Sequence, residues 1–572
     1  MRSLGVRLAM ELLPALKPAF PAIGAPRVSF PGQRRNVSGG ASYAGVGKAI
    51  ALVCLSRHRA RRNASADAGP EMLEPKRLAV ELQPPMPPLR PQEVLFGAVP
   101  GEDRGTNLME PPITRTDPFF WLRDDAHQNE EVQQLLEDED AYCCRALSSL
   151  QSFSEELYKE MQSHEKESSV GIPSVQGSFA YYTRGCKQQP YGIHFRARVG
   201  QSGAPVPQDV AVLAQAIDLQ LVDEELLLDE NDLNDDGEGG SRPYLSVCGP
   251  EPSADHLFIA YGEDWEGNDS YRVSFHDTRK PEMEEAELVE TDGSVLWEAE
   301  GHAAVYYVGH DHEFRGYVVR RHVVGSPQSA DTVVLEEKDR RFAVSICKSS
   351  DERFMIIQSA SSETAESYLL DLTARSDLVS VCPRQFGVHY EVDHCQGALY
   401  ILTDKDGAKN SKLCRTPLSS IPSQSSSWED VWLPDAHVHL DSLQSFEKFL
   451  ALTGRQDGAS CIYVMVLAPD GRGPIHSVSF PEMAVSRSFV HTPRTRAAAQ
   501  ALFSVSLGQN DHFKTDTLRV HYTSYIVPGR DYAYHVPTRE FKLIKESGPE
   551  RYNPSLYRAE RITSKHRQAG ST

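Results

Sequence analysis

Two histidines in residues 435–439 have the spacing of a metal-binding strand. His437 and His439 stand two residues apart, so on a β-strand both side chains would point to one face. A catalytic zinc ion needs such imidazole ligands and also a further histidine or carboxylate from other strands. The surrounding sequence lacks the alternating strands and helices that would supply them. We therefore expect two structural histidines and predict no metal and no cofactor; a metal-dependent hydrolase centred on this pair is a distant alternative.

A serine nucleophile on a strand-to-helix elbow needs the pattern Gly-x-Ser-x-Gly, because only small residues fit on either side of the turn. This pattern is absent from the 572 residues, and the nearest matches are Gly200–Ala204 and Gly458–Ile462. The glycine patterns of phosphate loops and dinucleotide sites are absent as well. From its residues alone, the chain is predicted to carry no catalytic residue.

The ten cysteines form no Cys-x-x-Cys pair, so the sequence predicts reduced thiols and no structural zinc. The net charge of −21 argues against a nucleic-acid partner, because such proteins need basic groups to displace counterions from phosphate. No run of 18 apolar residues occurs, so no membrane-spanning helix is predicted.

The first 66 residues differ in charge from the rest of the chain. They hold eleven basic residues and one acid, a net charge of +10, so the other 506 residues carry −31. A basic, acid-poor leader ahead of an acidic body is typical of a transit peptide for a plastid or a mitochondrion. The alternative is a cytoplasmic protein in which these residues are a disordered tail or come from a misassigned upstream start codon.

The elements that could position functional groups begin after a Pro-rich stretch at 67–115, which lacks periodicity and is predicted to be a linker or wrapping arm. Asn129 followed by two acids predicts the start of a helix, and Ser152 with Glu155 has the spacing of a capping box for a second helix. From Phe179 onward the apolar period is two, which is typical of strands.

One strand-turn-strand unit recurs seven times. Its starts are Phe179, Leu257, Ala304, Arg353, Ala398, Phe449 and Leu518. The four middle separations are 45 to 51 residues, the length of a four-stranded propeller blade. We therefore predict a mainly β fold with a seven-bladed β-propeller; a pair of β-sandwiches with coincidental spacing is the weaker alternative.

Several stretches resemble the prolyl-oligopeptidase family of serine peptidases, and most of all its oligopeptidase B branch. Asp117–Asp125 is similar to the family's N-terminal D-P-Y-x-W-L-x-D signature. Further similar stretches, in the family's order, are Tyr181–Arg184, Leu227–Asn231, Phe342–Val344, Tyr400–Asp404, Gly407–Asn410, Thr515–Arg519 and Tyr552–Ile562.

The resemblance implies a propeller that admits only short peptides to an α/β-hydrolase domain. That domain would begin just after Tyr552–Ile562, and its Ser, Asp and His would lie beyond residue 572. No catalytic residue can therefore be carried over, and we expect this chain to be a fragment or an incomplete gene model that is inactive alone, because acyl transfer needs all three groups together.

The predicted organisation is a transit peptide at 1–66, a linker or arm at 67–115, a helical N-terminal segment at 116–165, the propeller at 166–545, and the start of the connection to a missing hydrolase domain at 546–572. The predicted function is the N-terminal, substrate-gating part of a serine-type oligopeptidase acting in proteolysis of short peptides. Its predicted partners are those peptides and the missing or separate hydrolase domain. The alternative is a free-standing propeller that binds peptides or a protein partner.

Overall fold

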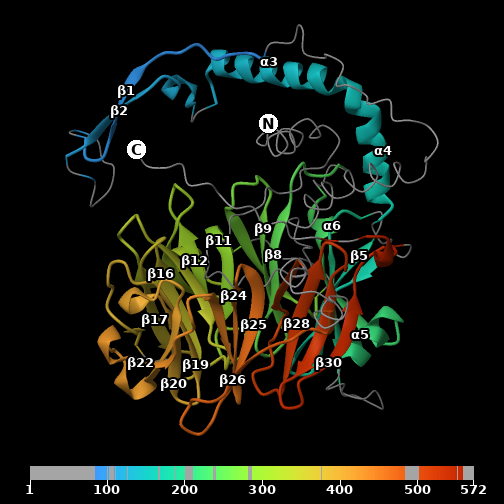
Figure 1. The fold of residues 1–572 in the computed structure, drawn as a ribbon, viewed down its shortest axis with the longest axis vertical. Coiled ribbons are helices and arrows are strands. Elements are labelled where there is room, and N and C mark those ends of the chain that lie inside the picture. The colour runs from blue at the N-terminus through green and yellow to red at the C-terminus, as the bar shows by residue number, and fades with distance from the viewer. Residues whose placement is uncertain are drawn as a thin grey trace, which may run out of the picture. The chain divides into compact units, whose positions relative to one another are not determined.

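The structure is a computed structural model (Figure 1). It describes residues 84–99, 101, 109, 111–124, 127–164, 168–186, 189–199, 210–235, 240–280, 287–374, 377–482, 502–549, 552–557 and 559. The predicted transit peptide at 1–66 lies outside these residues, as do Gly200–Ala204 and residues 560–572. The chain divides into two compact units, one containing residues 84–164 and the other residues 168–559, and each is described by itself.

The first unit contains a hairpin and two helices. Its elements are β1 (Gln92–Phe96), β2 (Ile113–Asp117), α3 (Glu130–Leu147) and α4 (Gln151–Gln162). The predicted start of the first helix is confirmed, because the side chain of Asn129 accepts a hydrogen bond from the Glu131 N–H at 3.1 Å.

The predicted capping box at Ser152 is wrong. Helix α4 begins at Gln151, and no side chain caps it. The reason lies in the preceding turn: Ser148, the residue that follows α3, keeps helical backbone angles, and the 3-10 turn that it begins leads directly into α4. A helix entered from a helical turn has fewer free N–H groups at its start, so it needs no serine cap.

The described part of the Pro-rich stretch contains a strand. Part of it forms β1, which pairs with β2 in antiparallel register. The Arg90 guanidinium lies 4.3 Å from the centre of the Trp121 ring and forms an ion pair with Glu131, and Trp121 donates to the Pro88 carbonyl at 3.0 Å. These contacts attach the stretch to the first helix. The hairpin is mostly exposed on both faces, which explains why its sequence shows no apolar alternation.

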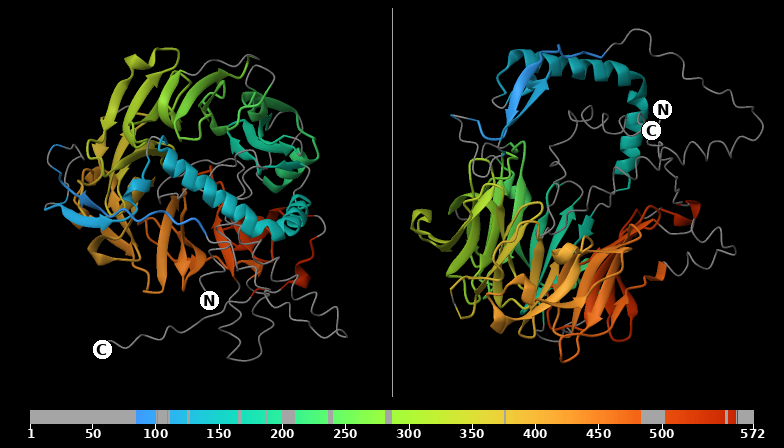
Figure 2. Two further views of the ribbon diagram at one scale, coloured as in Figure 1. Left: turned by 90° about the horizontal axis from the view of Figure 1, so that it is seen from above. Right: turned by 60° about the vertical axis from the view of Figure 1, so that its left-hand side comes forward.

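The second unit consists of antiparallel sheets that follow one another in sequence and in space around a common axis (Figure 2, left). A five-stranded sheet contains β3 (Ser168–Val170), β4 (Ser174–Gln176), β5 (Phe179–Cys186), β6 (Ile193–Arg198) and β7 (Glu224–Asp229). A seven-stranded sheet contains β8 (Ser246–Pro252), β9 (Phe258–Asp264), β10 (Tyr271–Asp277), β11 (Leu288–Trp297), β12 (Ala304–His310), β13 (Gly316–Val323) and β14 (Thr332–Glu336).

Four further sheets have four strands each. They are β15 (Ala343–Lys348), β16 (Phe354–Ala360), β17 (Ala365–Asp371) and β18 (Val379–Ser380); β19 (Tyr390–Cys395), β20 (Ala398–Thr403), β21 (Lys412–Pro417) and β22 (Glu429–Trp432); β23 (Val438–Ser445), β24 (Phe449–Gln456), β25 (Ala459–Val466) and β26 (Ile475–Ser477); β27 (Phe503–Leu507), β28 (Thr517–Ser524), β29 (Arg530–His535) and β30 (Glu540–Glu546). The fold is therefore a β-propeller. Each of the seven starts predicted from sequence lies within one residue of the start of a strand.

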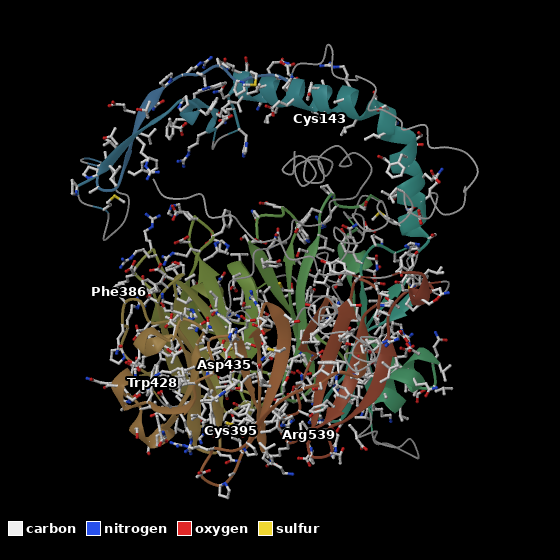
Figure 3. All side chains as sticks on the ribbon, viewed as in Figure 1. Cys143, Phe386, Cys395, Trp428, Asp435 and Arg539 are labelled. Carbon is white, nitrogen blue, oxygen red and sulfur yellow. The ribbon has the colours of Figure 1, made fainter. Side chains whose placement is uncertain are left out.

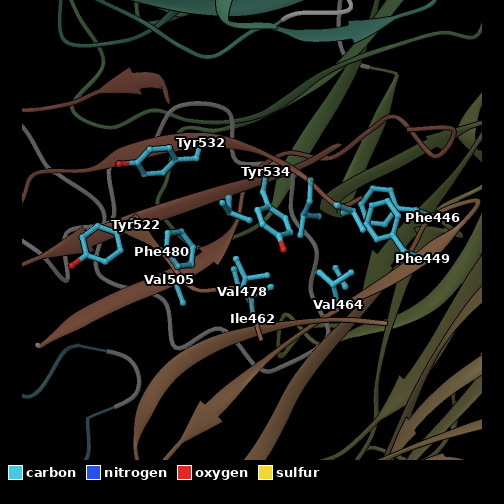
Figure 4. Close-up of a cluster of buried hydrophobic side chains, with 14 residues drawn as sticks. Phe446, Phe449, Ile462, Val464, Val478, Phe480, Val505, Tyr522, Tyr532 and Tyr534 are labelled. Carbon is cyan, nitrogen blue, oxygen red and sulfur yellow. The ribbon is translucent and has the colours of Figure 1, made fainter. Parts of the chain in front are cut away.

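Apolar clusters fill the space between consecutive sheets. In Figure 4, Phe449 and Ile462 of one sheet pack with Val505 and Tyr522 of the next. Similar clusters lie between three further pairs of consecutive sheets. A sheet that is covered on both faces needs apolar side chains on both faces. Successive residues of its strands are therefore apolar, and the sequence shows runs rich in Val, Ile and Tyr.

Strand β19, the first of its sheet, contacts both neighbouring sheets. The Asp393 carboxylate accepts from the Ser445 N–H of the following sheet and from the Ser350 N–H of the preceding sheet, both at 2.8 Å. The next residue, His394, hydrogen-bonds Asp351 of the preceding sheet at 2.7 Å. This one strand thus ties three sheets together.

The ring closes through side chains of the first and last sheets. Arg519 of β28 donates to the Pro173 carbonyl at 3.0 Å, and the Ser174 hydroxyl donates to Asp511. The described strands of the last sheet all come from residues 503–546, so here the first strand of the chain does not complete the last sheet. Polar contacts, not a shared strand, hold the two ends of the ring together. None of the helices in the described part of the chain is long and apolar enough to cross a membrane.

Candidate functional site

The propeller has two ends, and its upper end in Figure 1 is the candidate functional surface. Helix α6 (Glu230–Leu233), which follows the last strand of the first sheet, lies at this upper end, and α5 (Val210–Asp218) lies at the lower end. The link between the first two sheets therefore lies at the upper end. In Figure 3, Phe386, from another such link, lies near this end, whereas Cys395 and Arg539 lie near the lower end.

An arginine joins two sheets at the upper end. Arg384 forms ion pairs with Glu337, which follows β14, and with Glu366 of β17 at 3.3 Å. The Ser359 hydroxyl donates to Glu337 and accepts from Arg384 at 2.9 Å. The guanidinium also lies 3.7 Å from the centre of the Phe342 ring. Every partner is largely buried, so this cluster fixes the loops between two sheets.

A second charged cluster lies at the upper end of the last sheet. Arg530 forms ion pairs with Glu482 at 2.9 Å and with Glu546. The Tyr532 hydroxyl donates to Glu482 as well. Because Glu546 ends β30, the cluster holds the point where the chain leaves the propeller.

In the first sheet, a hydroxyl, an imidazole and a carboxylate form a row of hydrogen-bonded side chains. Thr183 Oγ1 lies 3.2 Å from His194 Nδ1, and His194 Nε2 lies 2.7 Å from Glu230 Oε1. Sequence analysis missed this row, because its members are distant along the chain and the nucleophile position holds a threonine. His194 is buried and Thr183 is half-buried. The row is a structural tie between β5, β6 and α6.

Ser270 and His310 form the shortest serine–histidine contact among the described hydrogen bonds. Ser270 Oγ lies 2.7 Å from His310 Nε2, and His310 Nδ1 contacts the Asp311 carbonyl at 2.9 Å. A triad needs an ionised carboxylate at this third position and backbone donors for the oxyanion. A neutral carbonyl supplies neither, so the pair is not a catalytic centre.

A third histidine lies between two acids at the lower end. His322 is fully buried and lies 2.9 Å from Glu287 and 2.8 Å from Asp331. Burial lowers the pKa of His322, but hydrogen bonds to the two carboxylates outweigh it and raise the pKa above its usual value. The three groups tie the β10–β11 link to the β13–β14 link.

The structure separates the predicted histidine pair. His439 lies on β23, but His437 precedes that strand, so the two do not share a strand face. His437 Nδ1 lies 3.0 Å from Asp457 and His439 Nδ1 lies 3.1 Å from Asp441, and both rings are exposed. Among the described residues, no group of three or more potential ligands could hold a metal ion.

The sulfur and hydroxyl groups that sequence analysis considered are not poised for nucleophilic attack. Burial raises the pKa of the Cys395 thiol and of the Cys414 thiol to about 12, so both stay protonated at neutral pH. Ser460, in one near-match to the elbow pattern, lies on β25 and accepts from the Val505 N–H at 2.8 Å. These three groups therefore supply no nucleophile.

Comparisons with known proteins all match the same part of the chain to the same kind of protein. The family model described as "Prolyl oligopeptidase, N-terminal beta-propeller domain" matches residues 100–547. The chain is 27% identical to dipeptidyl aminopeptidase BI of Pseudoxanthomonas mexicana over 449 residues, which cover 78% of this chain and 57% of that protein. It is 27% identical to Protease 2 of Moraxella lacunata over 452 residues, covering 78% of this chain and 58% of that protein.

Solved structures of oligopeptidase B are similar over the same part. The Leishmania major enzyme superposes with a TM-score of 0.68 at 29% identity, over 83% of this chain and 62% of that one. The Trypanosoma brucei enzyme, in a closed form with covalently bound antipain, gives a TM-score of 0.67 at 31% identity over the same shares. The chain thus spans about three fifths of the length of these relatives.

Proposed function

This chain belongs to the prolyl oligopeptidase family, and from that premise we propose that it is the substrate-gating propeller part of a serine oligopeptidase that cleaves short peptides. The observation that supports this most is the family match over residues 100–547, which spans nearly the whole propeller. In this proposal the triad belongs to an α/β-hydrolase domain, and the propeller selects what reaches it.

We further propose that the propeller has seven blades. The seven-stranded sheet would count as two blades that share the long strand β11. The register of β11 breaks between Thr291 and Val295; only the first part of the strand pairs with β10, while β12 pairs mainly with the second part. Two of the seven repeats found in the sequence, at Leu257 and Ala304, fall in this sheet.

The hydrolase domain is the proposed partner of the helical unit. Helices α3 and α4 expose apolar side chains at Leu136 and Phe153. Large exposed apolar side chains on one element commonly mark a protein interface. Their cover, in this proposal, is the hydrolase domain.

The proposed division of labour is tested by peptide hydrolysis. The purified chain is incubated with fluorogenic peptides that carry Arg or Pro before the reporter group. We expect no turnover, because acyl transfer needs nucleophile, base and oxyanion donors together. Turnover that a serine-directed inhibitor abolishes would refute the assignment of the triad to another domain.

A free-standing binding propeller is the second candidate. It is favoured by the propeller unit having its own apolar cores and its own ring closure. Determining the mass of the native protein distinguishes the two: a species of about the mass of this chain favours the binding module, and a species larger by a hydrolase domain favours the peptidase.

The leader at 1–66 supports a proposal of import into a plastid or a mitochondrion. Fusing these residues to a fluorescent protein tests it, and a purely cytoplasmic signal would contradict it.

A further inference from the structure

We propose that Arg242, Trp265 and Arg272, here called the arginine–tryptophan cluster, form a binding site for the carboxylate of a peptide at the upper end of the propeller. The proposal deepens the proposed function, on which it rests, by naming the group through which a peptide is held. The cluster lies in the seven-stranded sheet, where Trp265 is in the β9–β10 turn and Arg242 is in the link from α6 to β8.

Both guanidinium groups lie on the indole ring. The Cζ atom of Arg242 is 3.9 Å from the ring centre, and that of Arg272 is 5.2 Å away. Stacking on an aromatic ring orients a guanidinium plane without using its N–H donors. The two cations are thus held close together although their charges repel.

The donors of these two arginines are largely unused. Arg272 lies on β10, which pairs with β9, but within the described residues its guanidinium makes no hydrogen bond and no ion pair and only stacks on Trp265. Arg242 donates once, from Nε to the Leu233 carbonyl at 3.4 Å, which leaves its terminal nitrogens. The buried Nε1 of Trp265 faces the carboxylate of Glu263.

Arg242 and Arg272 differ in their pairing from two other arginines at the upper end. Arg384 and Arg530 each pair with two carboxylates. In a chain with 80 acidic and 59 basic residues, two adjacent arginines that form no ion pair within the described ranges stand out. An unpaired cation cluster in an acidic protein is the expected signature of an anion site.

One buried acid lies beside the cluster. Burial raises the pKa of Glu263, while the two guanidinium groups and a hydrogen bond from Trp265 act to lower it. Within the described residues no ion pair joins Glu263 to either arginine.

The loop that carries the tryptophan is rigid. The buried carboxylate of Asp264 accepts from the backbone N–H groups of Glu266, Gly267 and Asp269 at 3.0, 2.8 and 2.9 Å. The Arg242 backbone N–H donates to the Asn234 carbonyl at 2.8 Å. The site is therefore built before a ligand arrives, which reduces the entropy cost of binding.

A carboxylate fits these donors best. A guanidinium offers parallel N–H groups that match the two oxygens of a carboxylate, and every linear peptide ends in such a group. The same chemistry could come from an acidic side chain or from inorganic phosphate, so the experiment includes both.

The test is isothermal titration of the full chain with the tripeptide Ac-Ala-Ala-Ala and with its C-terminal amide. Ac-Ala-Asp-Ala-NH2 and inorganic phosphate are titrated in parallel. The variants are R242Q, R272Q and the double variant. The matched control is R279Q, which removes one positive charge from the same sheet, where Arg279 pairs with Asp277 at 2.7 Å. Far-UV circular dichroism and urea midpoints confirm that each variant is folded.

We expect the free acid to bind about tenfold more tightly than the amide, because a charged hydrogen bond contributes roughly that factor. Each single Gln variant should weaken binding of the acid by about tenfold. The control R279Q should bind like the wild type.

Equal binding of acid and amide would overturn the carboxylate site but leave peptide binding by the propeller, and so the proposed function, intact. Wild-type affinity in the double variant, or equal loss in R279Q, would also overturn it. Tight binding of phosphate or of the Asp peptide without binding of Ac-Ala-Ala-Ala would replace the terminal carboxylate by another anion. No binding of any probe would overturn the proposal.

Discussion

Replacing Arg384 by alanine should strongly destabilise the propeller at neutral pH. The substitution leaves Glu337 and Glu366 as carboxylates whose side chains are only 10% and 12% exposed. Removing one partner of a buried ion pair costs about 3–5 kcal/mol, because the remaining charge stays desolvated. We expect R384A to lower the free energy of unfolding by about 3 kcal/mol, at the low end of this range, because the Arg384 side chain itself is 19% exposed.

The effect should depend on pH in a defined direction. In the wild type, burial raises the pKa of Glu337, but the hydrogen bonds from Arg384, Ser359 and the Asp339 N–H outweigh it and lower the pKa. Glu337 therefore stabilises the fold above its unfolded pKa near 4.5, and this contribution is lost as the pH falls. Without Arg384, burial raises the pKa of Glu337. In the variant, Glu337 therefore becomes protonated as the pH falls, and the free-energy cost of burying its charge disappears. The difference in stability should be largest near pH 7–8 and shrink toward pH 4–5.

The assay is urea denaturation followed by far-UV circular dichroism at several pH values. The matched control is R455A, whose side chain is 64% exposed in its pair with Asp441 and which should change stability by less than about 0.5 kcal/mol. The double variant R384M/E337Q should recover about 1 kcal/mol of the loss, because it removes one of the two stranded charges. If R384A matches the control, or if its deficit does not change with pH, the reasoning about the buried carboxylates is wrong.

Three further outcomes are expected. The R519M variant should increase hydrogen–deuterium exchange at β4 and β28 more than elsewhere, because it removes the Arg519 contact that closes the ring; uniform exchange would contradict that role. Because the pKa of His322 is raised, its ion pairs stabilise the fold below pH 6.5 and this is lost as the pH rises through the raised pKa, so the stability gap between wild type and H322Q should be larger at pH 6 than at pH 9. At pH 8, iodoacetamide should modify the exposed Cys144 in the native protein but not the buried Cys395, whose pKa is about 12; mass spectrometry of the alkylated peptides decides, and fast labelling of Cys395 would refute its burial.

Sequence patterns found the repeating strands well, because the signal is local. The period-two runs at Ala304, Ala398 and Phe449 mark the first residues of β12, β20 and β24. Asn129 was identified as a helix cap for the same reason: a cap and the N–H group it satisfies lie within two residues.

Local patterns failed where the neighbouring element decides. Ser152 has the spacing of a cap but lies inside a helix that continues from a preceding turn. The segment Gln92–Phe96 becomes a strand because β2 pairs with it, and its own composition does not indicate this. His437 and His439 share a spacing but not a strand.

The sequence by itself determined the blade repeat, the acidic body, and the absence of an elbow motif within these 572 residues, because each depends on residue types and their spacing along the chain. Only the tertiary structure decided which charges meet. Arg519 reaches Pro173 across 346 positions, and Arg242 reaches Trp265 across a strand pair. Closing a ring of sheets brings such residues together, and no local periodicity encodes that closure.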